Sequence, residues 1–352
     1  MTREPKGAAP TGLRSDEGAT REGGASRAPG GERDDREPVP HWPGEFVSLG
    51  DHQVYLRSTP GDGGEPAQKE AALCVHGLAG SSRNWTDLTD LLRPWLAADA
   101  LDLPGFGDSP PRPDGRYSIA ALAQTVAALI ERRHKSPVHL IANSLGGTVS
   151  VKLAAARPEL IKTLTLISPA LPDSRPRLDL IRFPLISLPR VGPRLLSRYQ
   201  ALPPATRVAD VITTCYSDPA RFPPARFAVE VAELARRDTL DYATPALVGS
   251  IRTLTAEFFR VRHTAWRDAA RITAPCLVIY GSHDRLVDPR MAGRAAHAFR
   301  GARIVVLPRT GHLAHMEHPV QVAAEIGVLL GNSRPLQQVD RGAERDARAP
   351  AR

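Results

Sequence analysis

The sequence predicts an α/β protein in which the strands of a mostly parallel sheet alternate with helices. Short apolar runs typical of buried strands recur along the chain, and helical patterns follow several of them. The alternation stops after residue 170 and resumes at residue 275, which indicates one large insertion. The expected strands are residues 71–75, 97–101, 138–143, 161–167, 275–281 and 302–307.

The two ends of the chain differ in composition from this core. Residues 1–41 and 332–352 are rich in Gly, Ala, Pro, Arg and Glu and nearly lack aliphatic and aromatic side chains. Such segments bury too little apolar surface to offset the entropy lost on ordering, so we expect both to be disordered tails. No apolar signal-peptide region begins the chain, and no stretch is apolar for long enough to span a bilayer. We therefore expect a cytoplasmic protein without an integral membrane segment.

The first two expected strands each end in a turn-forming motif. Residues 71–75 lead into His76 and Gly77, after which Ser82 and Trp85 begin a helical pattern. Residues 97–101 lead into D-x-P-G-x-G-x-S at 102–109. The two loop glycines of the second motif do not predict a dinucleotide site, because a turn follows them instead of a helix.

Ser144 lies where the next expected strand changes to a helical pattern. Ala142 and Gly146, two positions to either side, make the sequence A-x-S-x-G. A serine at a strained strand-to-helix turn needs small neighbours, because larger Cβ groups would collide there. The pattern predicts that the Ser144 hydroxyl stands out above the sheet as a nucleophile.

Residues 171–267 form the inserted segment, which we expect to be mostly helical. Apolar residues at i, i+3 and i+4 predict helices at 225–236 and 247–260, whereas three prolines interrupt residues 182–193. Several apolar side chains could line a substrate pocket or form the segment's own core. They are Leu180, Ile181, Phe183, Leu185, Ile186, Phe258 and Phe259.

The formal net charge of +8 is concentrated in this segment, which holds fifteen arginines and nine acidic residues. Lysine is scarce and Ala, Pro and Arg are abundant throughout, which a high-GC coding bias would produce, so we expect no nucleic-acid partner. Two interpretations of the arginines stay open. They form an ordinary solvated surface, or they attract anionic substrates or headgroups.

Asp284 and His312 follow the last two expected strands, at 275–281 and 302–307. A serine hydroxyl is a poor nucleophile near neutral pH and needs an imidazole to accept its proton. The imidazole in turn needs a carboxylate to hold its tautomer and stabilise its charged form. We therefore expect Ser144 as nucleophile, His312 as base and Asp284 as the acid, with Asp173 as a rival acid after residues 161–167.

These motifs, with A-N-S-L-G-G at 142–147, G-x-x-D at 281–284 and G-H at 311–312, follow one another in a fixed order. Together they resemble the α/β-hydrolase fold superfamily over about residues 44–170 and 268–330. The resemblance implies an eight-stranded, mostly parallel sheet flanked by helices. It divides the chain into a core, residues 42–170 and 268–331, and a helical cap, residues 171–267, inserted after the sixth strand.

The resemblance also implies roles for the residues around Ser144. The backbone N–H groups of Leu78 and Leu145 would form an oxyanion hole. His76 would brace the loop that carries Leu78, not act as a catalytic base. Substrate class does not follow from the fold, since the superfamily includes esterases, lipases, thioesterases, carbon–carbon bond hydrolases and non-catalytic receptors.

No cofactor or metal is expected. The three cysteines, Cys74, Cys215 and Cys276, are scattered and do not form a disulfide framework or a metal-binding pair. His312, His315 and His318 recur every three residues, but a zinc site needs ligands that converge on one point. His312 already has a role in the triad.

Three functions stay open. The first is a serine hydrolase that cleaves a carboxylic ester or thioester of an apolar small molecule through an acyl-enzyme intermediate. The second is a carbon–carbon bond hydrolase of the meta-cleavage-product type, which the run 143–147 resembles. The sequence departs from that group at 76–80, where the group is glycine-rich, and at Leu313, where it tends to have tryptophan. The third is a ligand-binding protein with little turnover. Sequence alone determines neither the substrate's acyl and alcohol groups nor the oligomeric state.

Overall fold

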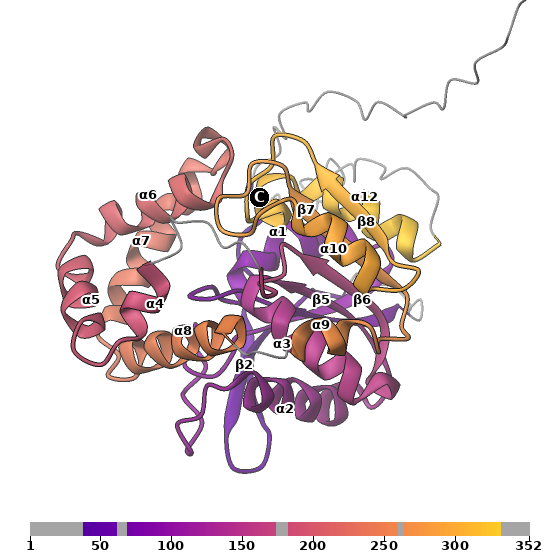
Figure 1. Cartoon of the computed structure of the whole chain (residues 1–352), viewed down its shortest axis with the longest axis horizontal. Helices are drawn as coiled ribbons and strands as arrows, with labels where there is room; N and C mark the ends of the chain where they lie inside the picture. The colour runs from indigo at the N-terminus through magenta and orange to yellow at the C-terminus, as the bar shows by residue number, and fades with distance from the viewer. Residues whose placement is uncertain (1–37, 62–68, 174–181, 260–263, 332–352) are drawn as a thin grey trace, which may run out of the picture. The chain divides into compact units, whose positions relative to one another are not determined.

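The computed structural model describes residues 38–61, 69–173, 182–259 and 264–331. Figure 1 shows one sheet with helices on both faces and a separate group of helices, α4 to α8, inserted between β6 and α9. The strands are β1 Gly44–Ser48, β2 Gln53–Ser58, β3 Glu70–Val75, β4 Leu96–Leu101, β5 Val138–Asn143, β6 Ile161–Ile167, β7 Cys276–Gly281 and β8 Arg303–Leu307. The helices outside the insertion are α1 Thr86–Leu92, α2 Ile119–Leu129, α3 Ser144–Ala156, α9 Thr264–Ala269, α10 Met291–Ala298, α11 Ala314–Glu317 and α12 Pro319–Leu329.

The eight strands form one sheet in the order β1-β2-β4-β3-β5-β6-β7-β8. The pairs β1–β2 and β2–β4 are antiparallel, and every other pair is parallel. The expected fold class is confirmed. All six strands expected from the sequence are present, with the same last residue and a first residue that differs by at most one.

Two apolar layers hold the helices on the sheet. One layer packs α2, α3, α9 and α10 against one face of the sheet, and the other packs α1, α11 and α12 against the opposite face. The central strands β5 and β7 are buried along their whole length, as strands covered on both faces must be. Their continuous apolar sequences made them easy to predict. All three cysteines are buried.

The inserted helices, called the cap below, are α4 Arg182–Ser187, α5 Gly192–Gln200, α6 Pro204–Cys215, α7 Pro224–Asp238 and α8 Ala243–Phe259. The helices expected at 225–236 and 247–260 correspond to α7 and α8; residue 260 lies outside the described residues. The irregular stretch expected at 182–193 was wrong in part, because α4 and the start of α5 lie there. Pro184 and Pro193 fall in the first turns of these helices, where no intrahelical bond needs a proline N–H.

Two expected boundaries need correction. The cap was expected to extend to residue 267, but that position falls inside α9, whose Ala265 and Trp266 belong to the core apolar layer. Residues 38–41 were expected in a disordered tail, yet the Val39 N–H donates to Asp87 at 3.1 Å and His41 contacts Thr86 at 2.8 Å. The rest of the two expected tails, residues 1–37 and 332–352, lies outside the described residues.

The first turn of α3 approaches β3 so closely that only glycine fits at position 146. A Cβ added to Gly146 would lie 2.4 Å from the Val75 carbonyl oxygen and 2.5 Å from that of His76. Both of these atoms belong to the backbone and cannot rotate away. We predict that Gly146→Ala lowers the free energy of unfolding by about 1–3 kcal/mol, measured by urea denaturation, because the helix must shift.

Gly293 in α10 is the matched control. An added Cβ there meets nothing within 4 Å, so Gly293→Ala should raise the free energy of unfolding by about 0.5–1 kcal/mol through helix propensity. If both variants are stabilised equally, the close approach at Gly146 does not constrain the protein.

Candidate active site

Ser144 begins α3 in a backbone conformation that few residues other than glycine adopt. Its φ is 52°, in the left-handed region, between the extended Asn143 and the rest of the helix. Ser144 is 9% exposed, so the residue is nearly enclosed. At this place the hydroxyl sits at the positive end of the α3 dipole, which favours negative charge developing nearby.

Asp284 and His312 are brought together as expected. The His312 ring Nδ1 donates to Asp284 Oδ2 at 2.8 Å, and both side chains are buried. The other carboxylate oxygen accepts the backbone N–H groups of Leu286 and Val287 at 2.8 and 2.9 Å. Burial alone would raise the pKa of Asp284, but the charge of His312 and these hydrogen bonds hold that pKa below its usual value. A carboxylate so placed keeps the Nδ1 proton on the ring and leaves Nε2 as the basic nitrogen.

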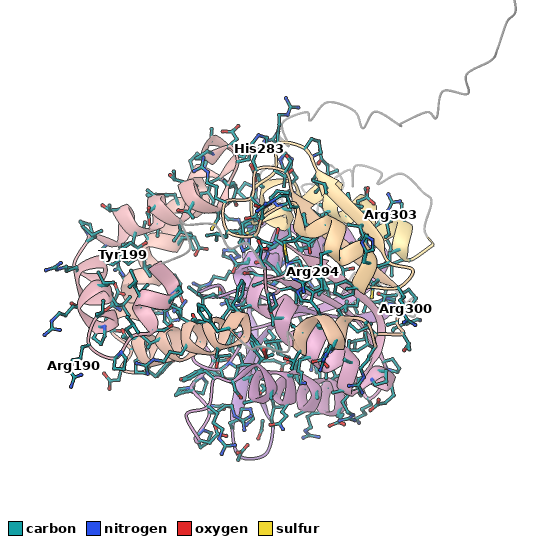
Figure 2. The ribbon with its side chains drawn as sticks, in the orientation of Figure 1. Arg190, Tyr199, His283, Arg294, Arg300 and Arg303 are labelled. Atoms are coloured by element: carbon teal, nitrogen blue, oxygen red, sulfur yellow. The ribbon has the colours of Figure 1, made fainter. Side chains whose placement is uncertain are left out.

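The loops after β7 and β8 lie side by side, and their backbones approach each other closely at Gly281. A Cβ on Gly281 would lie 2.1 Å from the Gly311 carbonyl oxygen, and the His283 N–H donates to the Thr310 carbonyl at 2.9 Å. Figure 2 labels His283 on this loop. Two residues far apart in the chain, Asp284 and His312, are therefore adjacent because the loops that carry them are bonded to each other.

Asn143 joins Ser144 to the histidine loop. Its side-chain amide donates to the His312 carbonyl at 3.2 Å and to the Ile167 carbonyl at 3.0 Å. The residue before Ser144 thus touches the backbone of His312. No hydrogen bond joins the Ser144 hydroxyl to the His312 ring among the described residues. The hydrogen bond between His312 and Asp284 is therefore formed in this structure, and the one between Ser144 and His312 is not.

His76 braces the loop that follows β3. The Leu103 N–H donates to its Nε2 at 2.9 Å, so Nδ1 carries the proton and donates to the Gly77 carbonyl at 2.7 Å. Burial lowers the pKa of His76 to about 4 and keeps the ring neutral. Because both ring nitrogens are occupied, the side chain has no free position from which to act as a base.

Asp102 braces the neighbouring loop after β4. One carboxylate oxygen accepts the Ser82 N–H at 2.5 Å and the other accepts the Asp108 N–H at 2.8 Å. Burial raises the pKa of Asp102 above its usual value, against the effect of these two donors. The carboxylate thus ties the loop after β4 to the turn that follows Leu78.

Leu78 and Leu145 carry the two backbone N–H groups expected to bind an oxyanion. Neither N–H donates to an acceptor among the described residues. The Leu145 group lies in the first turn of α3, where a helix leaves its N–H groups unpaired. The neighbouring carbonyl of Ala79 accepts from Arg237 of α7 at 3.2 Å, so a cap side chain holds this loop in place.

Asp173, the rival acid, does not take the place of Asp284. The acid bonded to the His312 ring is Asp284, and the charge of Asp173 acts on Arg290. The three spaced histidines make separate contacts. His315 stacks on Trp85 with ring centroids 4.3 Å apart, and His318 Nε2 contacts the Arg309 carbonyl at 3.2 Å. Across the described parts of the chain, no three potential ligands gather into a metal site.

Glu317 is a residue that sequence reasoning missed. Its buried carboxylate accepts the Gly311 N–H at 2.6 Å and the Asp218 N–H, from the cap, at 2.9 Å. The cap also contacts this loop directly, since the His312 N–H donates to the Cys215 carbonyl at 2.7 Å. The histidine loop is therefore held by the cap as well as by the core. A glutamate five residues after His312 gives no sequence signal of this bridge.

Seven apolar side chains could line a pocket or form the core of the cap, and the described ones, Leu185, Ile186, Phe258 and Phe259, do not line the hollow that the cap contains. That hollow, of about 350 Å³, lies between α6 and α7. It is lined by Ala209, Ile212, Thr213, Pro219, Phe222, Pro224 and Phe227. Leu185 and Phe259 are exposed instead, and Leu180, Ile181 and the side chain of Phe183 lie outside the described residues. Because none of Ser144, Asp284 and His312 touches this hollow, we do not assign the substrate site to it.

We predict that Glu317→Ala destabilises the protein and lowers any activity that depends on His312. The change leaves the buried Gly311 N–H and the part-buried Asp218 N–H without this acceptor. Loss of the acceptor for the buried group should cost about 1–3 kcal/mol of unfolding free energy in a urea titration. Glu317→Gln keeps one acceptor oxygen and should lie between Glu317→Ala and the parent protein. Glu325→Ala is the control, because its ion pair with Arg303 at 2.7 Å lies on the surface and should contribute less than about 1 kcal/mol. Equal losses at Glu317 and Glu325 would contradict the bridging role.

The chain is similar to several hydrolases and to an enzyme component. It is 25% identical over 275 residues to monoacylglycerol lipase abhd6-B of Xenopus laevis, covering 73% of this chain and 74% of the relative. It is 24% identical over 292 residues to a 2-hydroxy-6-oxononadienedioate/2-hydroxy-6-oxononatrienedioate hydrolase of Cupriavidus pinatubonensis, covering 82% and 95%. It is 27% identical over 310 residues to the dihydrolipoyllysine-residue acetyltransferase component of an acetoin cleaving system of Pseudomonas putida, covering 86% and 70%.

Solved structures share the fold at lower identity. The Lip1 structure from Acinetobacter baumannii superposes with a TM-score of 0.67 at 19% identity, covering 83% of this chain and 92% of that one. A 2-hydroxy-6-oxo-6-phenylhexa-2,4-dienoate hydrolase from Rhodococcus superposes with a TM-score of 0.66 at 19% identity, covering 82% and 100%. The model of the Alpha/beta hydrolase family matches residues 72–325, more than half of the sequence. With this sheet order and these motifs, the chain belongs to the alpha/beta hydrolase family.

Proposed function

We propose that this protein is a serine hydrolase that cleaves a carboxylic ester or thioester of an apolar small molecule. The observation that carries the proposal is the buried His312–Asp284 hydrogen bond beside a serine in a left-handed turn. A His–Asp hydrogen bond that only stabilised the fold would not need a strained serine at a helix start next to two unpaired backbone N–H groups. Lipase and esterase relatives support the same reaction class.

In this proposal Ser144 Oγ attacks the carbonyl carbon of the ester while His312 Nε2 accepts the hydroxyl proton. Asp284 holds the Nδ1 proton in place and stabilises the imidazolium that forms. The N–H groups of Leu78 and Leu145 bind the oxygen of the tetrahedral intermediate, each contributing about 3–4 kcal/mol to transition-state stabilisation in comparable sites. His312 then returns the proton to the leaving alcohol or thiol, and an acyl-enzyme remains on Ser144.

Water then completes the cycle as the second nucleophile, and Ser144 becomes the leaving group. His312 removes a proton from water, the hydroxide attacks the acyl carbon, and Ser144 Oγ leaves with the proton. Catalytic hydrogen bonds are often long in ligand-free proteins and tighten when substrate binds. The absence of a Ser144–His312 hydrogen bond in the described structure is therefore compatible with this mechanism. We expect that bond to form when substrate binds.

A second candidate is hydrolysis of a carbon–carbon bond in a ring-fission dienoate. The Cupriavidus relative covers 82% of this chain, and the run 143–147 resembles that group. Loss of the dienoate absorbance on mixing with protein, without turnover of p-nitrophenyl esters, would favour this candidate. A ligand-binding protein with little turnover would bind ester analogues but release no p-nitrophenol burst.

We predict that Ser144→Ala lowers the turnover of p-nitrophenyl esters by at least about a thousandfold and leaves the urea midpoint nearly unchanged. Ser150→Ala is a matched control on the same helix. Its hydroxyl is buried and has no hydrogen-bond partner among the described residues, so removing it should leave turnover intact. Parent-level turnover in Ser144→Ala would overturn the nucleophile assignment.

We also predict that a fluorophosphonate probe labels Ser144 and that His312→Ala abolishes this labelling. The probe reacts with a serine only when a base activates its hydroxyl. Mass spectrometry of the labelled peptide identifies the residue, and an unchanged circular dichroism spectrum separates loss of the base from loss of the fold. Labelling of His312→Ala at the parent rate would contradict the role of the imidazole. The substrate's chain-length preference then follows from a series of p-nitrophenyl esters of increasing acyl length.

A further inference from the structure

The turn between α4 and α5, continued along α5, exposes apolar and basic side chains together. Leu188, Val191 and Leu195 are 46%, 41% and 38% exposed. The Gly192 N–H donates to the Leu188 carbonyl and the Leu195 N–H to the Val191 carbonyl, at 2.9 and 3.0 Å. These helical i to i−4 bonds place residues three and four apart on one face. The three apolar side chains therefore form one exposed row.

A basic row accompanies the apolar one. Arg190, Arg194 and Arg198 are all exposed and are spaced four residues apart, so they share a face of the same turn and helix. Figure 2 shows Arg190 at the outer edge of the cap, directed away from the sheet. We call these six residues the cap ridge.

The opposite side of α5 already has its partners. Leu196 is buried, and the Gln200 amide donates to the Thr244 hydroxyl of α8 at 2.8 Å. Ser187 at the end of α4 contacts Thr255 of α8 at 3.2 Å. The opposite side of α4 and α5 packs on α8, so the ridge is the outward face of this helix pair.

The ridge arginines differ from three other arginines of the cap, which pair with carboxylates. Arg226 pairs with Asp87 at 2.6 Å, Arg236 pairs with Asp108 at 2.9 Å, and Arg207 pairs with Asp238. Within the described parts of the chain, no carboxylate lies within ion-pair distance of a ridge arginine. The sequence from 180 to 209 contains no Asp or Glu at all. The nearby Asp210 accepts a hydrogen bond from Tyr199 at 3.1 Å.

We propose that the cap ridge binds the surface of an anionic phospholipid bilayer. Arginine guanidinium groups bind headgroup phosphates, and leucine and valine side chains at the same level enter the boundary between headgroups and acyl chains. A nucleic acid or an acidic protein would match the arginines but would leave the interleaved apolar row in water. The two rows together match the charge and the apolar depth of a lipid surface.

This inference does not depend on the proposed hydrolase activity. The ridge contains none of Ser144, Asp284 and His312, so Ser144→Ala should bind vesicles as the parent does. Loss of ester turnover with retained vesicle binding would leave the ridge proposal standing. Retained turnover with no vesicle binding would overturn the ridge proposal alone.

The test is co-sedimentation of the full chain with phosphatidylcholine vesicles and with vesicles that also contain phosphatidylglycerol. We expect binding to the anionic vesicles, weak binding to phosphatidylcholine alone, and a fall in binding as salt is raised. Replacing all three ridge arginines by glutamine should weaken binding by about fivefold per arginine removed. The matched control replaces three exposed core arginines without ion pairs among the described residues, namely Arg132, Arg267 and Arg300. Equal losses in both triple variants would show attraction by diffuse charge and overturn the ridge.

A site-specific probe tests insertion of the apolar row. Leu195→Cys carries an environment-sensitive fluorophore, and Val328→Cys on α12, which is 54% exposed in the parent, is its control. The three native cysteines are buried, so labelling of the folded protein is confined to the introduced thiol. We expect a blue shift with anionic vesicles at position 195 and none at 328. A shift at both positions or at neither overturns the proposal, as does binding to heparin without binding to vesicles.

Discussion

The left-handed turn at Ser144 is the constraint on which the site depends. It requires the first turn of α3 to press against the end of β3, and the glycine at 146 is the residue that permits this approach. The turn places the hydroxyl at the start of a helix and beside the loop that carries Leu78. Strain at this single residue is offset by the apolar layers that fasten α3 to the sheet on its buried sides.

Buried polar groups hold the loops around this turn. Asp102 accepts two N–H groups, Glu317 accepts two more, and His76 links the loops after β3 and β4. Each of these side chains is satisfied on both of its polar ends, which is the condition under which burial of such groups is stabilising. The loops are therefore ordered by side chains that themselves take no part in the proposed reaction.

The cap is joined to the core by charge and backbone contacts, and an apolar cluster of the cap also packs against Leu286, Leu313 and Met316 of the core. Helix α7 faces the core with arginines that pair with Asp87 and Asp108 or donate to the Ala79 carbonyl. The loop after α6 meets the histidine loop through Cys215 and Glu317. Two groups of cap arginines thus differ. Arg226, Arg236 and Arg237 fasten the cap to the core, whereas the ridge arginines face outward without a carboxylate partner in the described structure.

The sequence by itself determined six of the eight strands, their ends, and the candidate residues that follow them. A continuous apolar run followed by a turn predicts a buried strand, and both signals are local in the sequence. Helices α7 and α8 were predictable for the same reason, whereas the prolines of α4 and α5 concealed two short helices. Only the tertiary structure decided that Glu317 bridges the cap to His312, which arginines are paired, and that residues 38–41 are held by the core. These features depend on contacts between residues far apart in the chain, which no local pattern encodes.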